Sequence, residues 1–412
     1  MSRPEPNTRE RRLFRAAVAA VAVHAATDAL FAPEPATHWS DHVSRGAVTL
    51  ALLGAAAAAY SRMRPGGRAA VAGALGVLAL EGSMLAFADA RAGGVRGEDW
   101  TGFLLAPAGV ALCLLASALL WRSRRGGRLR HLRRAVRVAG AGVAAFVLLV
   151  PIAVAIVATH RPRQTVHAVD LGRPASAVTI TTRDGLNLAA WYVPSRNGAA
   201  VISFPTRIGK VPEARMLARH GYGVLLLDAR GYDGSEGDSN LFGWGEASDI
   251  DAAVAWLQKR PGVRDDAVGG IGFSVGGEVM LEAAASNPSL RAVVSEGAGA
   301  RSVREELIRG PRGWVMVPEL AVQTAAVAVL SGTVPPPSLD AFVARIAPRP
   351  VFLIYAGRSN AGEDLNVEYF RAARPPKILW RIPEARHVGG FDARPREYER
   401  RVTEFFDGAL LR

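Results

Sequence analysis

Hydrophobic and polar positions follow different patterns in the two parts of this chain of 412 residues. From about Ala177 onward, short strand-like apolar runs alternate with stretches of helical character. This alternation predicts a mostly parallel sheet with helices on both faces. Strands are expected at 177–182, 186–193, 199–204, 224–228, 268–271, 290–295 and 351–355, and helices at 212–220, 246–258 and 278–285.

The first part of the chain contains long apolar stretches instead. Most of them approach the ~20 residues that a helix needs to cross a bilayer. They lie at 13–31, 47–60, 69–88, 103–121 and 139–158, and the second is marginal unless residues 42–46 extend it. We therefore expect an α-helical transmembrane bundle of five spans in residues 1–160, a linker at 161–176, and an α/β domain at 177–412.

The arginines predict how such a bundle would be oriented. The formal net charge is +13, and the arginines gather in alternate connections between the apolar stretches. The rich segments hold Arg3, Arg9, Arg11, Arg12 and Arg15 at the N-terminus, Arg62, Arg64 and Arg68 after the second span, and eight arginines between 122 and 137 after the fourth. The positive-inside rule places these segments and the N-terminus in the cytoplasm. An odd number of spans then places the α/β domain outside.

Other interpretations of this first part are weaker. A nucleic-acid patch is not expected, because the arginines lie between apolar spans, where anionic lipid headgroups are the adjacent partner. A cleaved signal peptide is not expected, since further spans follow the first. His24, Asp28 and Glu81 fall inside spans, and polar contacts between helices explain them better than a metal site does. Cys113 is the only cysteine, so no disulfide can form within the chain.

The strongest chemical signal is Gly272-Phe273-Ser274-Val275-Gly276, which matches the pattern G-x-S-x-G. It leaves an apolar stretch and enters a helix-prone one, and this strand, turn and helix are the setting of a nucleophile elbow. Glycines flank the serine because a Cβ on either side would collide with the neighbouring strand and helix. Ser274 is therefore the candidate nucleophile.

A serine hydroxyl needs partners before it can act as a nucleophile at neutral pH. An imidazole must take its proton, and an acid must hold that imidazole in the correct tautomer. His387 is the candidate base, because it follows the apolar run 378–382 and precedes Gly389-Gly390 in a loop.

Three motifs together make the segment from Ala177 to the C-terminus resemble the α/β-hydrolases. They are Leu225-Leu226-Leu227-Asp228-Ala229-Arg230-Gly231-Tyr232-Asp233-Gly234-Ser235-Glu236-Gly237, the elbow at Ser274, and Ala385-Arg386-His387-Val388-Gly389-Gly390. The resemblance implies the chain order nucleophile, acid, histidine. It also implies catalysis without a metal or an organic cofactor.

The acid is harder to assign. The resemblance places it after the strand 351–355, at the fourth position of a G-x-x-D turn, but that position is Asn360. Glu363 is favoured as the next carboxylate, with Asp364 second. Glu296 is the third candidate, because some members of the fold carry their acid directly after the strand 290–295.

The oxyanion hole requires two backbone N–H groups that point at the developing negative charge. One is expected from Val275, directly after the nucleophile. The other is expected from Thr206 in the loop after the strand 199–204, because the preceding Pro205 has no N–H.

An insertion at about 301–349 separates two strands of the predicted sheet. It contains the apolar run 314–330, which Pro318, Glu319 and Gln323 interrupt. We interpret the run as lid helices over the site and not as a sixth span.

The sequence thus predicts a membrane-anchored serine hydrolase that cleaves a small-molecule ester or acyl substrate through an acyl-enzyme. Two alternatives remain open. One is a peptidase or amidase of the same fold. The other is a non-catalytic membrane sensor or transporter whose hydrolase-like domain only binds a ligand.

Overall fold

The computed structural model describes residues 6–31, 39–93, 99–122, 128–159, 169–204, 211–232, 234–359 and 362–412. These residues form two compact units, one up to Val150 and one from Pro151 onward. The division falls inside a single helix, α6 (Arg128–Thr159).

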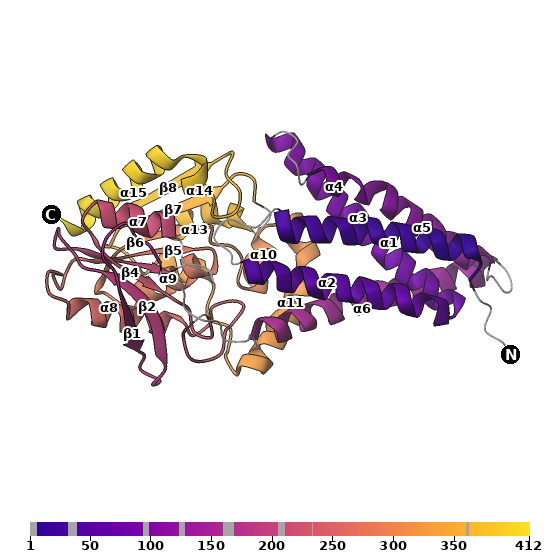
Figure 1. The fold of residues 1–412 in the computed structure, drawn as a ribbon, viewed down its shortest axis with the longest axis horizontal. Coiled ribbons are helices and arrows are strands. Elements are labelled where there is room, and N and C mark those ends of the chain that lie inside the picture. Colours follow the sequence, from indigo (N-terminus) through magenta and orange to yellow (C-terminus); the bar gives the residue numbers. More distant parts are fainter. Residues whose placement is uncertain are drawn as a thin grey trace. The chain divides into compact units, whose positions relative to one another are not determined.

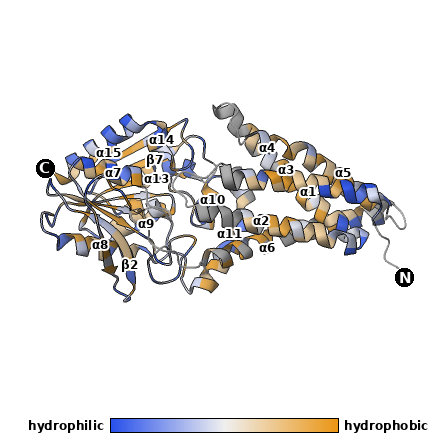
Figure 2. Cartoon of the chain, in the orientation of Figure 1, coloured by the Kyte–Doolittle hydropathy of each residue, from blue (hydrophilic) through white to orange (hydrophobic). Residues whose placement is uncertain are grey.

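Helices make up the described part of the first unit (Figure 1). They are α1 (Thr8–Phe31), α2 (Trp39–Ala59), a short 3-10 turn η1 (Tyr60–Arg62), α3 (Pro65–Gly93), α4 (Asp99–Phe103), α5 (Leu105–Arg122) and the first part of α6. Each expected apolar stretch falls largely within one of the five long helices, and Figure 2 shows apolar residues along much of their length.

Glycines bring α3 and α5 into close contact. A Cβ added to Gly109 would lie 2.8 Å from the carbonyl oxygen of Gly76, and one added to Gly76 would lie 3.0 Å from that of Gly109. Small residues that allow two backbones to approach are characteristic of helix pairs in membranes, where dispersion contacts replace the hydrophobic effect.

Hydropathy supports fewer membrane crossings than the sequence pattern predicts. Among the described residues, one helical stretch, Trp100–Arg122, is long and apolar enough to cross a bilayer, with a mean hydropathy of 2.3. The other long helices offer no comparable stretch within the described residues. The expected five-span bundle is therefore not supported beyond this stretch, which contains α5.

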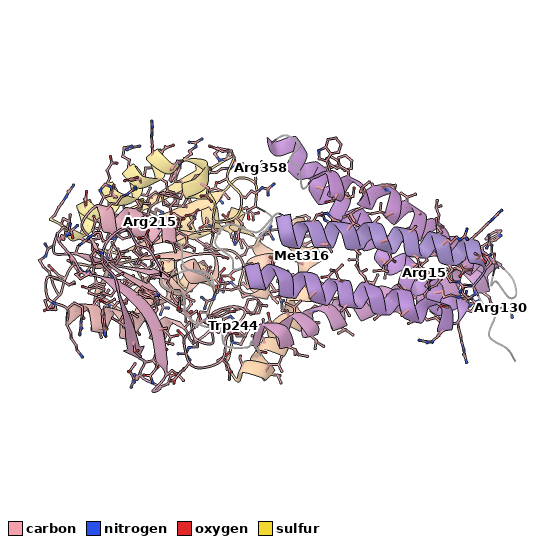
Figure 3. The ribbon with its side chains drawn as sticks, viewed as in Figure 1. Arg15, Arg130, Arg215, Trp244, Met316 and Arg358 are labelled. Atoms are coloured by element: carbon pink, nitrogen blue, oxygen red, sulfur yellow. The ribbon has the colours of Figure 1, made fainter. Side chains whose placement is uncertain are left out.

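The arginine-rich ends of several helices gather at one end of the first unit. Arg68 of α3 forms a buried ion pair with Glu10 of α1 at 2.8 Å, and Tyr60 donates a hydrogen bond to the same carboxylate. Arg15 and Arg130 lie at this end as well (Figure 3). Inside the unit, His24 is within hydrogen-bond distance of Thr101 (3.2 Å), which agrees with a polar contact between helices. The side chains of Asp28 and Glu81 lie outside the described residues.

An eight-stranded sheet forms the centre of the second unit. Its strands are β1 (Ser176–Thr181), β2 (Asn187–Val193), β3 (Ala200–Phe204), β4 (Gly223–Leu227), β5 (Val268–Phe273), β6 (Leu290–Glu296), β7 (Val351–Ala356) and β8 (Lys377–Ile382). The order across the sheet is β1-β2-β4-β3-β5-β6-β7-β8. The pairs β1–β2 and β2–β4 are antiparallel and all later pairs are parallel, so the mostly parallel sheet is confirmed.

Helices cover both faces of this sheet (Figure 1). One buried core includes α7 (Val211–Arg219) and α15 (Pro395–Leu410), and the other includes α8 (Ala247–Gln258), α9 (Val275–Ser286) and α13 (Asn366–Ala372). Gly269 and Gly270 of β5 allow two helices to approach from opposite sides. A Cβ on Gly269 would lie 2.8 Å from Phe406 of α15, and one on Gly270 would overlap Met280 of α9.

The insertion after β6 folds as α10 (Val303–Ile308), α11 (Pro311–Ser331) and α12 (Leu339–Val343). Pro318 does not break α11, which continues through it as one helix. The apolar part of α11, Met316–Ser331, is shorter than a membrane-crossing helix. Val327 of α11 is buried with Ala155 at the end of α6 and with Phe242 and Trp244. The insertion therefore packs within the second unit.

Candidate active site

Ser274 occupies a sharp turn between β5 and α9. Its backbone has φ 52° and ψ −124°, a combination that is strained for a residue with a side chain. The flanking glycines make the turn possible. A Cβ on Gly272 would overlap the carbonyl oxygen of Gly276, and a Cβ on Gly276 would overlap that of Phe204 at the end of β3. Ser274 thus lies in a strand-turn-helix setting of the kind that the sequence pattern predicts.

His387 reaches the serine from the loop after β8. Its Nε2 lies 2.7 Å from Oγ of Ser274, and its Nδ1 lies 2.6 Å from Oε1 of Glu363. A carboxylate can only accept, so the Nδ1–H donates to Glu363 and the lone pair of Nε2 accepts from the serine hydroxyl. The side chain of His387 is 15% exposed, so it is not fully buried.

Glu363 is held firmly in this contact. It begins the 3-10 turn η2 (Glu363–Leu365), directly after Gly362, whose φ of 81° is left-handed. Its side chain is 1% exposed, and its second oxygen, Oε2, accepts a hydrogen bond from the N–H of Ala356 at the end of β7. The two oxygens are thus shared between the imidazole and the sheet, which fixes the orientation of the carboxylate.

The two other candidate acids lie elsewhere. Asp364 points away from the imidazole, is 52% exposed, and pairs with Arg309 of the lid at 3.0 Å. Glu296 is buried, but its carboxylate accepts hydrogen bonds from the N–H of Gly390 and the hydroxyl of Tyr398. Asn360, which occupies the position that the resemblance gives to the acid, lies outside the described residues.

One expected donor of the oxyanion hole is in place. Val275 is the first residue of α9, where backbone N–H groups have no acceptor within the helix and the helix dipole favours negative charge. Thr206, the other expected donor, lies outside the described residues. Its loop starts beside the elbow, because Phe204 pairs with Gly272 across the parallel strands β3 and β5.

A buried carboxylate near the serine was not identified from the sequence. Glu278 lies one helical turn after Ser274 on α9, and its Oε1 accepts a hydrogen bond from the N–H of Gly299 at 3.0 Å. Burial raises the pKa of Glu278 to about 7, although Arg301 and the Gly299 N–H lower it. The spacing of four residues from the nucleophile could have indicated a shared helix face.

Backbone strain among the described residues is concentrated at this site. Ser274 and Val388 are the two non-glycine residues with positive φ in the part of the chain that the structure describes. Val388 directly follows His387, and its φ of 46° is costly for a β-branched side chain. Strain of this kind persists only where surrounding contacts enforce it, and it clusters at functional sites.

No group of three or more His, Cys, Asp or Glu side chains in the described ranges could hold a metal ion. The arrangement contains instead a hydroxyl, an imidazole and a carboxylate joined in series. This set can activate the hydroxyl for attack on an electrophilic carbon.

Comparisons with known proteins bear on the fold and on the class of enzyme. The model of the X-Pro dipeptidyl-peptidase (S15) family matches residues 155–351, a little under half of the chain. The matched region contains Ser274 and ends before Glu363 and His387.

Two curated proteins illustrate the relationship in sequence. A polyketide transferase from a Penicillium species is 32% identical over 130 residues, which are 30% of this chain and 44% of that protein, so the chain spans less than half of this relative. The uncharacterised protein YfhR of Escherichia coli K12 is 24% identical over 252 residues, which are 57% of this chain and 82% of that protein.

A solved structure shows the same fold. An esterase of Pyrococcus furiosus matches with a TM-score of 0.50 at 24% identity, over 61% of this chain and 98% of the esterase. The second unit therefore has the α/β-hydrolase fold, and the chain is an enzyme of this fold.

Proposed function

We propose that this enzyme is a serine hydrolase that cleaves a carboxylic ester through an acyl-enzyme intermediate. The observation that carries the proposal is the continuous contact from Ser274 through His387 to Glu363, at 2.7 and 2.6 Å. The buried carboxylate supports it, because it fixes the base.

In the first half of the reaction, Oγ of Ser274 attacks the ester carbonyl carbon while Nε2 of His387 takes the hydroxyl proton. Negative charge develops on the carbonyl oxygen, and the N–H of Val275, assisted by that of Thr206, donates to it. The carbon–oxygen ester bond then breaks, and the leaving alcohol takes the proton from His387. Glu363 stabilises the imidazolium throughout and stays ionised.

In the second half, a water molecule replaces the alcohol. His387 takes a proton from the water as its oxygen attacks the acyl carbon, and the resulting intermediate expels Oγ of Ser274. The proton on Nε2 returns to the serine, and the carboxylic acid leaves.

Labelling with a fluorophosphonate tests the activated serine. We expect the wild-type protein to react and Ser274→Ala to show neither labelling nor hydrolysis of p-nitrophenyl esters, and His387→Ala to lose at least about a thousandfold in kcat. An unreactive wild-type protein would favour the alternative in which the domain only binds a ligand as part of a membrane sensor or transporter.

A second candidate is a peptidase or amidase with the same residues in the same roles. The match to the S15 family favours it, since members of that family are described as X-Pro dipeptidyl-peptidases. Comparing p-nitrophenyl esters with aminoacyl and X-Pro p-nitroanilides discriminates the two. A higher kcat/KM for the anilides would replace the ester proposal.

Our proposal includes anchoring in a membrane by the N-terminal helices. The apolar stretch that contains α5, the glycine contact between α3 and α5, and the shared arginine-rich end support it. Five spans with the arginine-rich end in the cytoplasm would place the hydrolase domain and its ester substrate outside the cytoplasm.

A further inference from the structure

Glu296, the last residue of β6, contacts both halves of the candidate site. Its backbone oxygen accepts a hydrogen bond from the N–H of Ser274 at 2.7 Å. Its carboxylate oxygen Oε1 accepts from the N–H of Gly390 at 2.7 Å, three residues after His387. The second oxygen, Oε2, accepts from the hydroxyl of Tyr398 on α15 at 2.6 Å. Glu296 thus joins three parts of the fold. They are the turn at Ser274, the loop 385–391 that carries His387 (the histidine loop), and the helix α15.

We propose that Glu296 is a positioning residue, whose carboxylate holds the histidine loop at the distance from Ser274 that proton transfer requires. This inference rests on the proposed function, because it assigns a role within the same site. It also gives a role to a carboxylate that the imidazole does not contact.

The histidine loop has reason to need such a tether. Val388, next to His387, is held at positive φ, so the loop must be constrained by its surroundings. Within the loop, Gly389 donates a hydrogen bond to Arg386, which closes a turn but does not attach it to the elbow. The carboxylate of Glu296 supplies that attachment through Gly390.

Close packing around the tether shows that the fit is tight. A Cβ on Gly390 would lie 2.7 Å from Oε1 of Glu296, so glycine at this position allows the carboxylate to approach the backbone. A Cβ on Gly297, the next residue along the chain, would lie 2.6 Å from Val388 and 3.4 Å from Cε1 of His387. The segment 296–297 therefore packs against the imidazole of His387 and against Val388.

The chemistry of the tether predicts which substitution can replace it. The carboxylate accepts two hydrogen bonds, one from an N–H and one from a hydroxyl. An amide can still accept from Gly390 through its oxygen, while its NH₂ donates to the oxygen of Tyr398, which can accept. Glutamine can therefore preserve the geometry without the charge, and alanine cannot.

The experiment compares Glu296→Ala, Glu296→Gln and a matched control in the full-length protein. Ser295→Ala is the control, because Ser295 is the buried neighbour in β6 and its hydroxyl has no hydrogen-bond partner among the described residues. Steady-state kcat and KM are measured with p-nitrophenyl acetate, together with the thermal midpoint. Hydrogen exchange of the peptide 385–391 reports on the loop independently of activity.

We expect Glu296→Ala to lower kcat roughly 10- to 100-fold with KM changed less than about twofold, because a displacement of about 1 Å at a catalytic group costs that much. Glu296→Gln should recover kcat to within about fivefold of wild type, and Ser295→Ala should match wild type. The loop peptide should exchange faster in the alanine variant alone.

Three results would overturn the tether. They are wild-type kcat and exchange in Glu296→Ala, a glutamine variant as impaired as the alanine variant, or an equal loss in Ser295→Ala. Failure of the proposed function looks different, because the wild-type protein would then show no esterase activity and no fluorophosphonate labelling. In that case the exchange of the loop peptide in Glu296→Ala still decides whether the tether exists.

Discussion

Two adjacent carboxylates, Glu363 and Asp364, have opposite environments at the residue scale. Glu363 points inward to His387 and the N–H of Ala356, whereas Asp364 points outward to Arg309. The left-handed Gly362 starts the 3-10 turn that sets these directions. Only a carboxylate in the inward position can fix the tautomer of the imidazole.

The first residue-scale prediction follows from that difference. Glu363→Gln should lower kcat by roughly 10³- to 10⁴-fold, because an amide at this position can donate to Nδ1 and stabilise the wrong tautomer. Asp364→Asn should stay within a few-fold of wild type, since its charge pairs with the lid and not with the base. Steady-state hydrolysis of a p-nitrophenyl ester measures both. A severe loss in Asp364→Asn with a mild one in Glu363→Gln would reverse the assignment.

A second residue-scale prediction concerns Glu278. Burial raises the pKa of this carboxyl group from 4.5 to about 7. Below pH 4.5 the folded and unfolded chains both carry its proton. As the pH rises toward 7 the unfolded chain releases this proton first, so folding stability falls by up to about 3 kcal/mol. Glu278→Gln removes this loss, so its thermal midpoint relative to wild type should be several degrees higher at pH 8 than at pH 5.

Thermal unfolding of both proteins in detergent at the two pH values measures this shift. The amide oxygen of glutamine retains the hydrogen bond from Gly299, so the comparison isolates ionisation. A difference between the variants that does not change with pH would refute it.

Ser274 and His387 could be predicted from the sequence because the requirements of each are local. The nucleophile needs glycines two residues away on both sides, and the base needs a loop after an apolar run. For the acid the sequence left three candidates, with Glu363 favoured over Asp364 and Glu296. The turn at Gly362 decides that Glu363 faces inward, and no sequence pattern there separates Glu363 from Asp364. The tether at Glu296 depends on Gly390 and Tyr398, which are distant in the chain, so no local pattern indicates it.

At the scale of elements, the site depends on how closely α9 approaches β3. A Cβ on Gly276 would overlap the backbone oxygen of Phe204, and a backbone atom cannot move aside as a side chain can. The first turn of α9 therefore keeps Val275 in its present position, as the proposed oxyanion donor requires, only while residue 276 is glycine.

Gly276→Ala should accordingly lower the thermal midpoint and reduce kcat by at least about tenfold, because the oxyanion donor moves with the helix. Gly408→Ala in α15 is the matched control. A Cβ at residue 408 would lie 3.8 Å from Arg412, which is an ordinary van der Waals contact. Alanine also stabilises a helix by up to about 1 kcal/mol relative to glycine. Circular dichroism and esterase assays measure the two effects. Wild-type activity in Gly276→Ala would contradict the close approach.

Seven of the eight strands were predictable because apolar runs of strand length alternate with helical ones. The apolar run 378–382, which forms β8, was not among the expected strands. Features that depend on a distant neighbour were not predictable. Gly269 and Gly270 look unfavourable inside a strand, and the approach of Phe406 and Met280 explains them. Pro318 interrupts the apolar run 314–330 in the sequence, but α11 continues through it as one helix. The N-terminal helices were located correctly, but the five expected membrane crossings are not supported, since one stretch of the described residues, Trp100–Arg122, is long and apolar enough.

At the scale of the whole molecule, the proposed orientation depends on the arginines. Glu10 and Arg68 form a buried pair near Arg15 and Arg130, so several arginine-rich helix ends share one end of the first unit. Moving that many guanidinium groups across a bilayer is strongly disfavoured.

Fusions to alkaline phosphatase, which is active only outside the cytoplasm, test this orientation. A fusion after Arg412 should be active and a fusion after Arg130 should be silent, because the five spans that we propose would place the two points on opposite sides. Comparable expression of both fusions is the control. The opposite pattern would place the hydrolase domain in the cytoplasm.

The separation of Ser274 from His387 has a consequence for synthesis. The two residues lie 113 positions apart, so the ribosome completes the elbow long before it adds the base. Elements made early can fold while later ones are still missing. A nascent chain that carries Ser274 but not yet His387 has no imidazole to take the proton of the serine hydroxyl. We therefore expect the serine to become reactive late in translation. Because Ser274 precedes His387 in the chain, the serine cannot be acylated efficiently before the histidine has been added.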